Sequence, residues 1–502
     1  IHVINDFIMK RDIAYLFTLL FLLAISPLLF SIAAQTTKIG VISDLHYAHP
    51  SIIGEKGEAL SNYLKKDRKL ILESEALLLK TVSLLIDENV NIVLIPGDLS
   101  KDGEKISHQG VTDILQPLLN KGVKILVIPG NHDIDNPEAT RYDGSFTSQV
   151  ESVTPKEFSE IYNEFGYGEA ISLDSFSLSY VSEPIEGLRV ICIDDCRYYD
   201  NTFISRGDKE DKYITAGRIK PETLKWIKTE IQVAKLLGKD VIGMMHHNVV
   251  EHFDYQSIFM SPYIVEDFKN IQKLFLEEGL SAVFTGHFHA TDISAVNDET
   301  GNSLYDIETG SIVTYPCPYR IVDYNDGTLS IKTKYIQEIN YPLGDSIDFQ
   351  TYAREQLQTG IHEMISSMIH AYYDYLPGYI PTWAKSFIKF PEEDKFTTMI
   401  LDHLYPPLVE MIPAHYCGNE PDVIDYQIKK ENMINGIDDF IDEFAAQSIT
   451  SFTEMSKMYI RNTEIIRQLK SAVISIWNDT NYNDQINDLD LVIYSTSERT
   501  NK

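Results

Sequence analysis

Five short clusters of Asp, Asn and His are the part of this sequence best suited to chemistry. Each cluster directly follows a short apolar segment of the kind that forms a buried strand. Carboxylate, amide and imidazole groups are costly in a core and are common ligands of metal ions. The joint pattern therefore predicts a metal centre. In chain order the clusters are Asp44-x-His46, Gly97-Asp98, Gly130-Asn131-His132-Asp133, His246-His247 and Gly286-His287-x-His289.

Strands that end at one edge of a sheet would position these clusters. Residues 123–128 are mostly β-branched or long aliphatic, and Pro129-Gly130 ends the segment just before Asn131. Residues 38–43 and 91–96 repeat the order of apolar residues followed by polar ones. Because ligands gather at the carboxyl ends of parallel strands, we expect three strands to deliver side chains to one edge.

The rest of the chain predicts an α/β part followed by a helical part. Strands and helices alternate from residue 38, which is typical of a layered α/β fold. Past about residue 345, apolar residues recur every three or four positions, as on one face of a helix. We therefore expect one compact domain over residues 35–345 and a helical domain over 346–502. Further strands are expected at 188–193, 240–245 and 281–285, a closing antiparallel meander at 304–307, 319–324 and 329–335, and helices near 68–87, 107–119, 221–237, 264–278, 396–404 and 424–445.

The N-terminal residues predict an export signal. Met9-Lys10-Arg11, the apolar residues 13–32 and Ala33-Ala34-Gln35 correspond to the basic, hydrophobic and small-residue regions of a signal peptide. We assign residues 1–34 to this signal, with residues 1–8 as an upstream extension. An uncleaved anchor is the alternative, because about 20 apolar residues span a bilayer. Either way the folded part is expected to be secreted, periplasmic or held at the cell envelope, and such an anchor would be its one link to a membrane.

The composition limits the partners of the protein. The chain has 502 residues, with 43 Lys and Arg against 74 Asp and Glu, and a net charge of −31. This charge repels polyanions and argues against a protein that coats nucleic acid, so a small substrate is favoured. The four cysteines lack metal-site spacing and are expected to be buried free thiols, with one disulfide as the alternative. The oligomeric state is not fixed by the sequence.

The five clusters, in this order over residues 44–289, resemble the signature of the calcineurin-like metallophosphoesterase superfamily. Residues 97–104, 130–137, 165–167 and 246–248 resemble, more specifically, the secreted bacterial class III cyclic-nucleotide phosphodiesterases. The resemblance implies a four-layer αββα sandwich with a dinuclear metal centre and a C-terminal helical domain. It also implies two sets of ligands, Asp44, His46, Asp98 and His289 for one metal ion and Asp98, Asn131, His246 and His287 for the other.

One segment departs from the family pattern. Many members follow the paired histidines with prolines, whereas Asn248-Val249 follow here, so the loop and its substrate contacts are expected to differ. His246 is the expected ligand of the pair, and His247 is the alternative.

The implied reaction is hydrolysis of a phosphoric ester by metal-activated hydroxide. Two metal ions with two anionic ligands keep a positive charge that attracts phosphate and lowers the pKa of bound water. Nitrogen and oxygen ligands without thiolate favour Mn, Fe or Zn over Mg or Ca. His132 is expected to stabilise the transition state or to protonate the leaving oxygen. Asp133 is expected to orient His132, with Asp102 as the alternative.

The leading interpretation is a phosphodiesterase for small phosphodiesters, cyclic nucleotides among them. A phosphomonoesterase of the same fold is the first alternative. A metal-bound scaffold whose helical domain binds partners is the second, although His132 and a full set of seven ligands count against it. Substrate contacts are expected from loop residues near the motifs, namely His108, Asn136, Arg141, His252 and Tyr319.

Overall fold

The computed structural model describes residues 36–345, 348–379, 389–418, 420–448, 460–480 and 487–494. The expected export signal at residues 1–34 lies outside the described residues and stays a prediction. Among the helices of the described ranges, none combines the length and the apolar character that crossing a membrane requires.

The first sheet has six strands in the order β15-β14-β13-β1-β2-β3. Strands β1 (Thr37–Val41), β2 (Ile92–Ile95) and β3 (Lys124–Val127) pair in parallel at its centre and edge. The whole of β2 is buried, which is why it consists of aliphatic residues without polar alternation. The three segments that were expected to end at one edge are therefore adjacent parallel strands.

The second sheet has seven strands in the order β11-β12-β10-β9-β8-β7-β6. Its central strands β8, β9, β10 and β12 are parallel, and β11 and β7 pair antiparallel beside them. The carboxyl ends of β9 and β10 hold the two paired-histidine motifs. The strand bounds are β6 (Ser172–Leu173), β7 (Tyr180–Ile185), β8 (Leu188–Cys192), β9 (Asp240–Met244), β10 (Ala282–Thr285), β11 (Asp292–Asn297) and β12 (Ser303–Glu308).

The expected closing meander is wrong in one strand. Strands β13 (Pro318–Asn325) and β14 (Thr328–Tyr335) form an antiparallel hairpin around Asp326-Gly327, whose φ values of 42° and 78° suit a tight turn. Strand β12, however, belongs to the second sheet, where it pairs with β10 and β11. The apolar sequence of a short strand predicts that it is buried, but it does not predict which sheet the strand joins.

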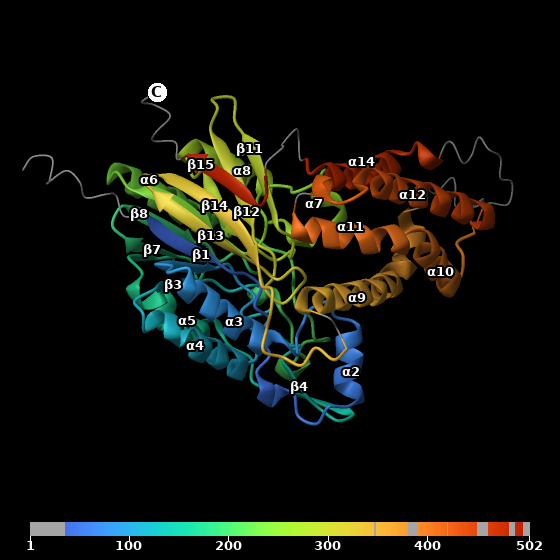
Figure 1. Ribbon diagram of the computed structural model, residues 1–502, viewed down its shortest axis with the longest axis horizontal. Coiled ribbons are helices and arrows are strands. Elements are labelled where there is room, and N and C mark those ends of the chain that lie inside the picture. Colours follow the sequence, from blue (N-terminus) through green and yellow to red (C-terminus); the bar gives the residue numbers. More distant parts are fainter. Residues whose placement is uncertain are drawn as a thin grey trace, which may run out of the picture. The chain divides into compact units, whose positions relative to one another are not determined.

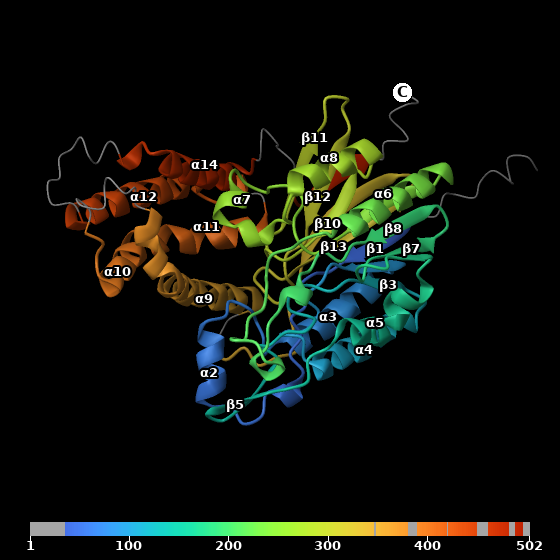
Figure 2. The ribbon, with the colours of Figure 1, turned by 180° about the vertical axis from the view of Figure 1, so that it is seen from behind.

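Helices cover the outer face of each sheet (Figures 1 and 2). Helices α3 (Ser74–Asp87) and α4 (Lys105–Leu119) share one apolar cluster with the first sheet, and this cluster continues into residues of the second sheet. Helices α6 (Pro221–Leu236) and α8 (Phe268–Glu278) pack on the other face of the second sheet. The layers are therefore helix, sheet, sheet and helix, as the resemblance implied.

Shorter elements lie around these layers, namely α2 (Glu58–Lys65), β4 (Thr140–Asp143), β5 (Phe146–Gln149), α5 (Pro155–Ile161) and α7 (Gln256–Phe259). Helix α3 begins six residues later than the predicted helix near 68–87. Residues before the helix make a different contact: the backbone N–H of Leu70 donates to the carbonyl of Val313. Residues 67–70 thus lie against the segment that follows β12.

The described helices after residue 345 bury their apolar residues in two further clusters, and they are grouped at one end of the sandwich (Figure 1). Their bounds are α9 (Phe349–Tyr372), α10 (Glu393–His403), α11 (Tyr405–Cys417), α12 (Tyr426–Ser448) and α14 (Glu464–Asn478). Leu357 and Ile361 of α9 pack with Ala290, which directly follows His289. The helical part therefore contacts the sandwich close to a predicted ligand.

The described chain after α14 returns to the first sheet. Strand β15 (Asp490–Tyr494) pairs antiparallel with β14, and Leu329 lies opposite Ile493. The periodicity predicted a helical domain over residues 346–502, so this strand is a correction to that prediction. The four cysteines are free thiols, with Cys192, Cys196 and Cys317 buried and Cys417 partly buried.

Candidate metal centre

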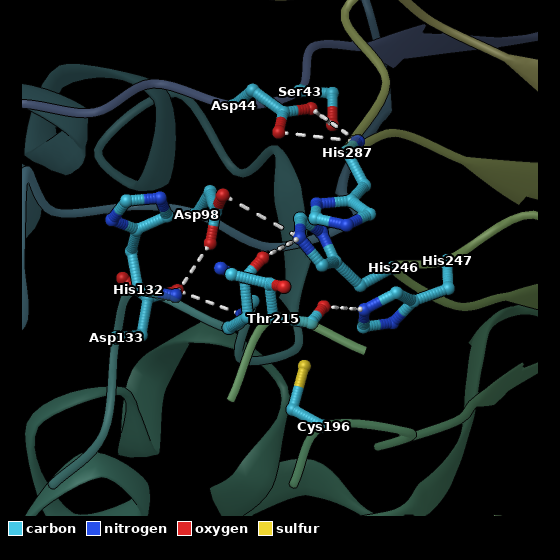
Figure 3. A network of polar contacts seen from close by, with 12 residues as sticks. Ser43, Asp44, Asp98, His132, Asp133, Cys196, Thr215, His246, His247 and His287 are labelled. Atoms are coloured by element: carbon cyan, nitrogen blue, oxygen red, sulfur yellow. Dashed lines mark hydrogen bonds and ion pairs between the residues drawn. The ribbon is translucent and has the colours of Figure 1, made fainter. Parts of the chain in front are cut away.

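The carboxyl ends of five strands bring the seven predicted ligands together. Figure 3 labels Asp44, Asp98, His246 and His287 among them. Strands β1, β2 and β3 supply the ligands of the first sheet, and β9 and β10 supply those of the second. Every one of the seven is at least 93% buried. They are Asp44 and His46 after β1, Asp98 after β2, Asn131 after β3, His246 after β9, and His287 and His289 after β10.

Asp44, His46 and His289 form the first group of ligand atoms. Their ligand atoms all lie within 4.8 Å of one another. The Nε2 atom of His289 lies 3.2 Å from Nε2 of His46 and 3.4 Å from Oδ1 of Asp44. The hydroxyl of Thr314 lies 3.1 Å from the other ring nitrogen of His289 and helps to fix the ring.

Asp98, Asn131, His246 and His287 form the second group. Nε2 of His246 lies 3.0 Å from Oδ1 of Asn131 and 3.5 Å from Oδ2 of Asp98. The opposite nitrogen, Nδ1, lies 2.7 Å from the carbonyl of Pro96, and Nε2 of His287 lies 3.2 Å from that of Pro262. Such bonds to carbonyls fix the tautomer of a histidine and leave its other nitrogen for a metal ion.

Asp98 lies between the two groups. The Nε2 atoms of His46 and His246 are each 3.5 Å from its Oδ2, while its Oδ1 accepts from the backbone N–H of His132 at 2.9 Å. Burial alone raises the pKa of this carboxyl, but the imidazoles of His246, His132 and His46 together bring it well below its usual value. Asp98 is therefore an ionised carboxylate in the position expected of a bridging ligand.

The residues around His246 fit a metal cation. Because its Nδ1–H donates to a carbonyl, the neutral ring presents a lone pair to oxygen acceptors of Asn131 and Asp98. Lone pairs that face one another repel unless a positive charge lies between them. Burial lowers the pKa of His246, but the carboxylates of Asp98, Asp44 and Asp195 together raise the pKa to about 10. The pocket thus favours positive charge at this point.

The backbone at the ligands is strained. Five of the seven predicted ligands, Asp44, His46, Asp98, His287 and His289, have φ values between 37° and 73°. Residues other than glycine adopt this left-handed region at a cost of about 1–3 kcal/mol, and they cluster at functional sites. Neighbouring glycines allow close approach, because a Cβ on Gly130 would lie 2.1 Å from Oδ1 of Asp98.

The structure places His246, and not His247, at the centre. The ring of His247 points toward Thr215, whose carbonyl lies 2.7 Å from its Nε2, and its Nδ1 lies 3.2 Å from Oδ2 of Asp195 (Figure 3). The carboxylate of Asp195 also accepts from the backbone N–H groups of both histidines. Asp195 and His247 thus fix the chain after β9, while the ring of His246 faces the other predicted ligands Asn131 and Asp98.

His132 lies beside the ligands and is held by Asp102. Its Nδ1 is 2.8 Å from Oδ1 of Asp102, and its side chain is 14% exposed, more than any of the seven ligands. Burial lowers the pKa of His132, but Asp98 and Asp102 raise it above its usual value overall. Lys101 forms a buried ion pair with Asp102 in turn. The arrangement favours the protonated form of the imidazole next to Asp98.

The orienting contact expected from Asp133 is made by Asp102 instead. The carboxylate of Asp133 accepts from the backbone N–H groups of Gly130, Leu99 and Ser100, at 2.8, 3.1 and 2.9 Å, and from the hydroxyl of Ser100. With four donors, this carboxylate fixes the loops that carry Asp98 and Asn131.

Three of the five expected substrate contacts are enclosed in the protein. His108 bonds to the carbonyl of Asp133 and to the hydroxyl of Tyr162, both at 2.9 Å. His252 lies between Asp292 and Asp306, and Tyr319 is buried in β13. A loop position near a motif does not imply a side chain that faces the site, because buried imidazoles must find partners of their own.

The other two expected contacts lie in different surroundings. Asn136 is buried and donates to the carbonyl of His132 at 3.0 Å, so it supports the loop that holds this residue. Arg141 is exposed on β4, where its guanidinium lies 3.6 Å from Oδ2 of Asp143. Its contact with substrate stays a prediction.

Side chains that the sequence analysis did not select also surround the centre. Lys69 contributes, after burial, to lowering the pKa of His46, and its charge also acts on His132. Tyr213 lies 5.6 Å from the ring centroid of His132, and Tyr263 lies 4.8 Å from that of His287. An isolated basic or aromatic residue between predicted elements has no distinctive pattern, so these positions could be found only from the structure.

Comparison with known proteins identifies the family. The family model of the calcineurin-like phosphoesterases matches residues 37–291. Two proteins named probable cyclic nucleotide phosphodiesterase align over 70 residues, at 33% identity for Vesicomyosocius okutanii and 38% for Ruthia magnifica. Each alignment covers 14% of this chain and 29% of the relative, so the match spans less than a third of these curated relatives.

The comparison with solved structures finds two phosphatases. A dimetal phosphatase from Danio rerio has 17% identity and a TM-score of 0.42, covering 60% of this chain and 96% of that one. A purple acid phosphatase from yellow lupin (Lupinus luteus) has 12% identity and a TM-score of 0.36, covering 60% and 52%. The family match spans half of the chain and includes all five strands that carry the predicted ligands. This chain therefore belongs to the calcineurin-like phosphoesterases.

Proposed function

We propose that this chain hydrolyses phosphodiester bonds and that cyclic nucleotides are among its substrates. The observation that supports the proposal is the pair formed by His132 and Asp102 next to Asp98. A ribose oxygen leaves poorly as an alkoxide, so its departure benefits from a positioned proton donor. The names of the two partly aligned relatives are consistent with this substrate class.

Different residues of the chain have different roles in the proposed reaction. Asp102 holds the His132 imidazole in one orientation, and His132 then gives its proton to the leaving oxygen. Lys69, whose ammonium pairs with Oδ2 of Asp67 at 3.5 Å, also acts on His46 and His132, where its charge would favour an anionic substrate. The two ligand groups would hold two ions of Mn, Fe or Zn, which supply Lewis acidity and lower the pKa of bound water.

A comparison of substrates tests the proposal. The purified full chain is reconstituted with Mn, Fe or Zn, and kcat/KM is measured for a bis-aryl phosphodiester, an aryl phosphate monoester and a set of cyclic nucleotides at one pH. We expect both kinds of diester to be cleaved more efficiently than the monoester. Asp98→Asn is expected to lose both metal content and activity.

Two results would contradict the proposal. A higher kcat/KM for the monoester would favour a phosphomonoesterase of the same fold. Full metal content without turnover of any of these esters would favour a scaffold.

A further inference from the structure

A second group of acidic side chains lies where the helical part meets the sandwich. Asp292 lies at the start of β11, Asp479 follows α14, and Asp488 precedes β15. One carboxylate oxygen from each of the three lies within 4.8 Å of the other two. Oxygen ligands at about 2.3–2.6 Å from a calcium ion are separated by up to about 5 Å, so this spacing suits one shared cation.

Glu420 is an independent sign of a ligand at this group. Its side chain is 99% buried, and its Oε1 lies 2.6 Å from Nδ1 of His415. Within the ranges that the structure describes, its Oε2 has no hydrogen-bond partner. Nδ1 of His415 is also 3.8 Å from Oδ2 of Asp292, so Glu420 lies next to the group. After burial, the charge of Glu420 is among the causes that raise the pKa values of Asp479 and Asp488.

The charges around the group leave an excess of carboxylates. The guanidinium of Arg320 donates to the carbonyls of Asp488 and Glu308 and to the hydroxyl of Thr333. Oδ1 of Asp488 accepts from the backbone N–H of Ile293 at 2.7 Å, and the side chains of Asp479 and Asp488 share a hydrogen bond. His252 is shared between Asp292 and Asp306. The basic groups that face the cluster are Arg320, His252 and His415, and the acidic ones are Asp292, Asp306, Glu308, Glu420, Asp479 and Asp488.

The position of Asp479 adds to this excess. It caps the C-terminus of α14 with a φ of 51°. The C-terminus of a helix carries a partial negative charge, so a carboxylate there is unfavourable unless a cation compensates for it. The backbone of Gly418 lies close to the same place, because a Cβ on it would be 3.1 Å from Cβ of Asp488. The segments that carry Asp292, Asp479 and Asp488 thus meet at one cluster of carboxylates between the sandwich and the helical part.

We propose that Asp292, Asp479, Asp488 and Glu420 bind one calcium ion that fastens the helical part to the sandwich. The donor atoms are all carboxylate oxygens, which suits a hard cation such as calcium, whereas the imidazole-rich centre suits Mn, Fe or Zn. The calcium site is separate from the metal centre and does not depend on the proposed reaction.

Calcium binding to the full chain tests this site. Protein with its metal centre loaded is treated with EGTA, and calcium content and Tm are then measured as Ca²⁺ is added. We expect one calcium ion per chain and a rise in Tm of roughly 3 °C when calcium reaches about 100 times its Kd. His289→Ala should still bind this calcium, because the altered residue belongs to the metal centre.

Two variants locate the ion. Asp479→Asn is expected to weaken calcium binding at least about 10-fold and to keep the Mn, Fe or Zn content of the parent. Asp490→Asn is the matched control, since it removes the same charge from an exposed position on β15 and should bind calcium like the parent. Glu420→Gln serves the same purpose as Asp479→Asn if that variant does not fold. Absence of calcium binding in the parent, or parental binding by both Asp479→Asn and Glu420→Gln, would overturn the proposal.

Discussion

Asp102 and Asp133 both support the loop that carries His132, but they bind different groups of it. Asp133 accepts from backbone N–H groups and fixes the path of the chain, whereas Asp102 contacts the imidazole of His132. A carboxylate on one ring nitrogen fixes the tautomer and favours the protonated ring. A ligand atom of His132 lies within 4.8 Å of ligand atoms of His46 and Asp98. At the scale of single residues, the proposal makes His132 the proton donor and Asp102 its positioning group, apart from the seven predicted ligands.

Replacement of His132 tests this separation. His132→Ala is expected to leave metal content unchanged and to lower kcat by roughly 10²–10⁴-fold for a cyclic nucleotide. The loss should be smaller for a nitrophenyl ester, because nitrophenolate needs little protonation to leave. Steady-state kinetics with both substrates and elemental analysis of the variant provide the measurement.

Asp102→Asn is the companion variant. It should show the same dependence on the leaving group with a smaller loss, since it acts through His132. An equal loss for both leaving groups would indicate electrostatic stabilisation by the imidazolium. Loss of metal from His132→Ala would show that His132 is a ligand.

The ends of strands β2 and β3, which carry predicted ligands, approach each other closely at Gly130, where a larger residue would not fit. A Cβ on Gly130 would lie 2.1 Å from Oδ1 and 2.2 Å from the backbone N of Asp98. The backbone N cannot rotate away as a side chain can, so the loop itself would have to move. The close approach of the ends of β2 and β3 therefore depends on this residue.

Gly130→Ala is accordingly expected to displace Asp98. We expect loss of metal from the centre, a drop in kcat of about 10²-fold or more, and a cost of roughly 1–3 kcal/mol in the free energy of unfolding. Metal content, kinetics and urea unfolding give the measurement. Gly378→Ala is the control, because its added Cβ meets open space. Parental metal content in Gly130→Ala would contradict the expected crowding.

Much of this framework could be predicted from the sequence. Strands such as β2 and β3 are continuous apolar runs that end in a polar cluster, so the pattern predicts these strands and the polar side chains at their ends. Which of those side chains are ligands was implied by the resemblance to the family. Strand β11 could not be found, because its sequence mixes polar and apolar residues, and β12 could not be assigned to a sheet. Contacts such as that of Asp102 with His132 depend on where loops fold back, which periodicity does not encode.

At the scale of the whole molecule, buried charges link the helices to the sandwich. His415 of α11 contacts Glu420 and lies near Asp292 of β11. Burial lowers the pKa of His415, but the carboxylates of Glu420 and Asp292 raise it overall to about 9. A histidine with a raised pKa stabilises the fold in its protonated form.

The stability of the chain should therefore depend on pH through His415. Its contribution is complete below the unfolded pKa of about 6.5 and is lost as the pH rises through about 9. His415→Gln is expected to lower the free energy of unfolding most at pH 6, with a difference from the parent that shrinks toward pH 9.5. Urea unfolding at several pH values in EGTA measures this difference.

His370→Gln is the control for this experiment. His370 forms a pair of the same length, 2.6 Å, with Glu393, but its side chain is 80% exposed. An exposed pair contributes about 0–1 kcal/mol, so this variant should differ little from the parent at any pH. A difference for His415→Gln that does not vary with pH would contradict a role for its protonation.

The return of β15 to the first sheet affects how the protein is made. Residues 336–489 must leave the ribosome before β15 can join β14, so the outer edge of β14 stays open during their synthesis. At roughly 5–20 residues per second, that interval is on the order of ten seconds. An open strand edge is a template for pairing with other chains. The nascent sandwich is therefore most exposed to aggregation in one interval. This interval begins when the strands that carry the predicted ligands and β14 are complete, and it ends when β15 is translated.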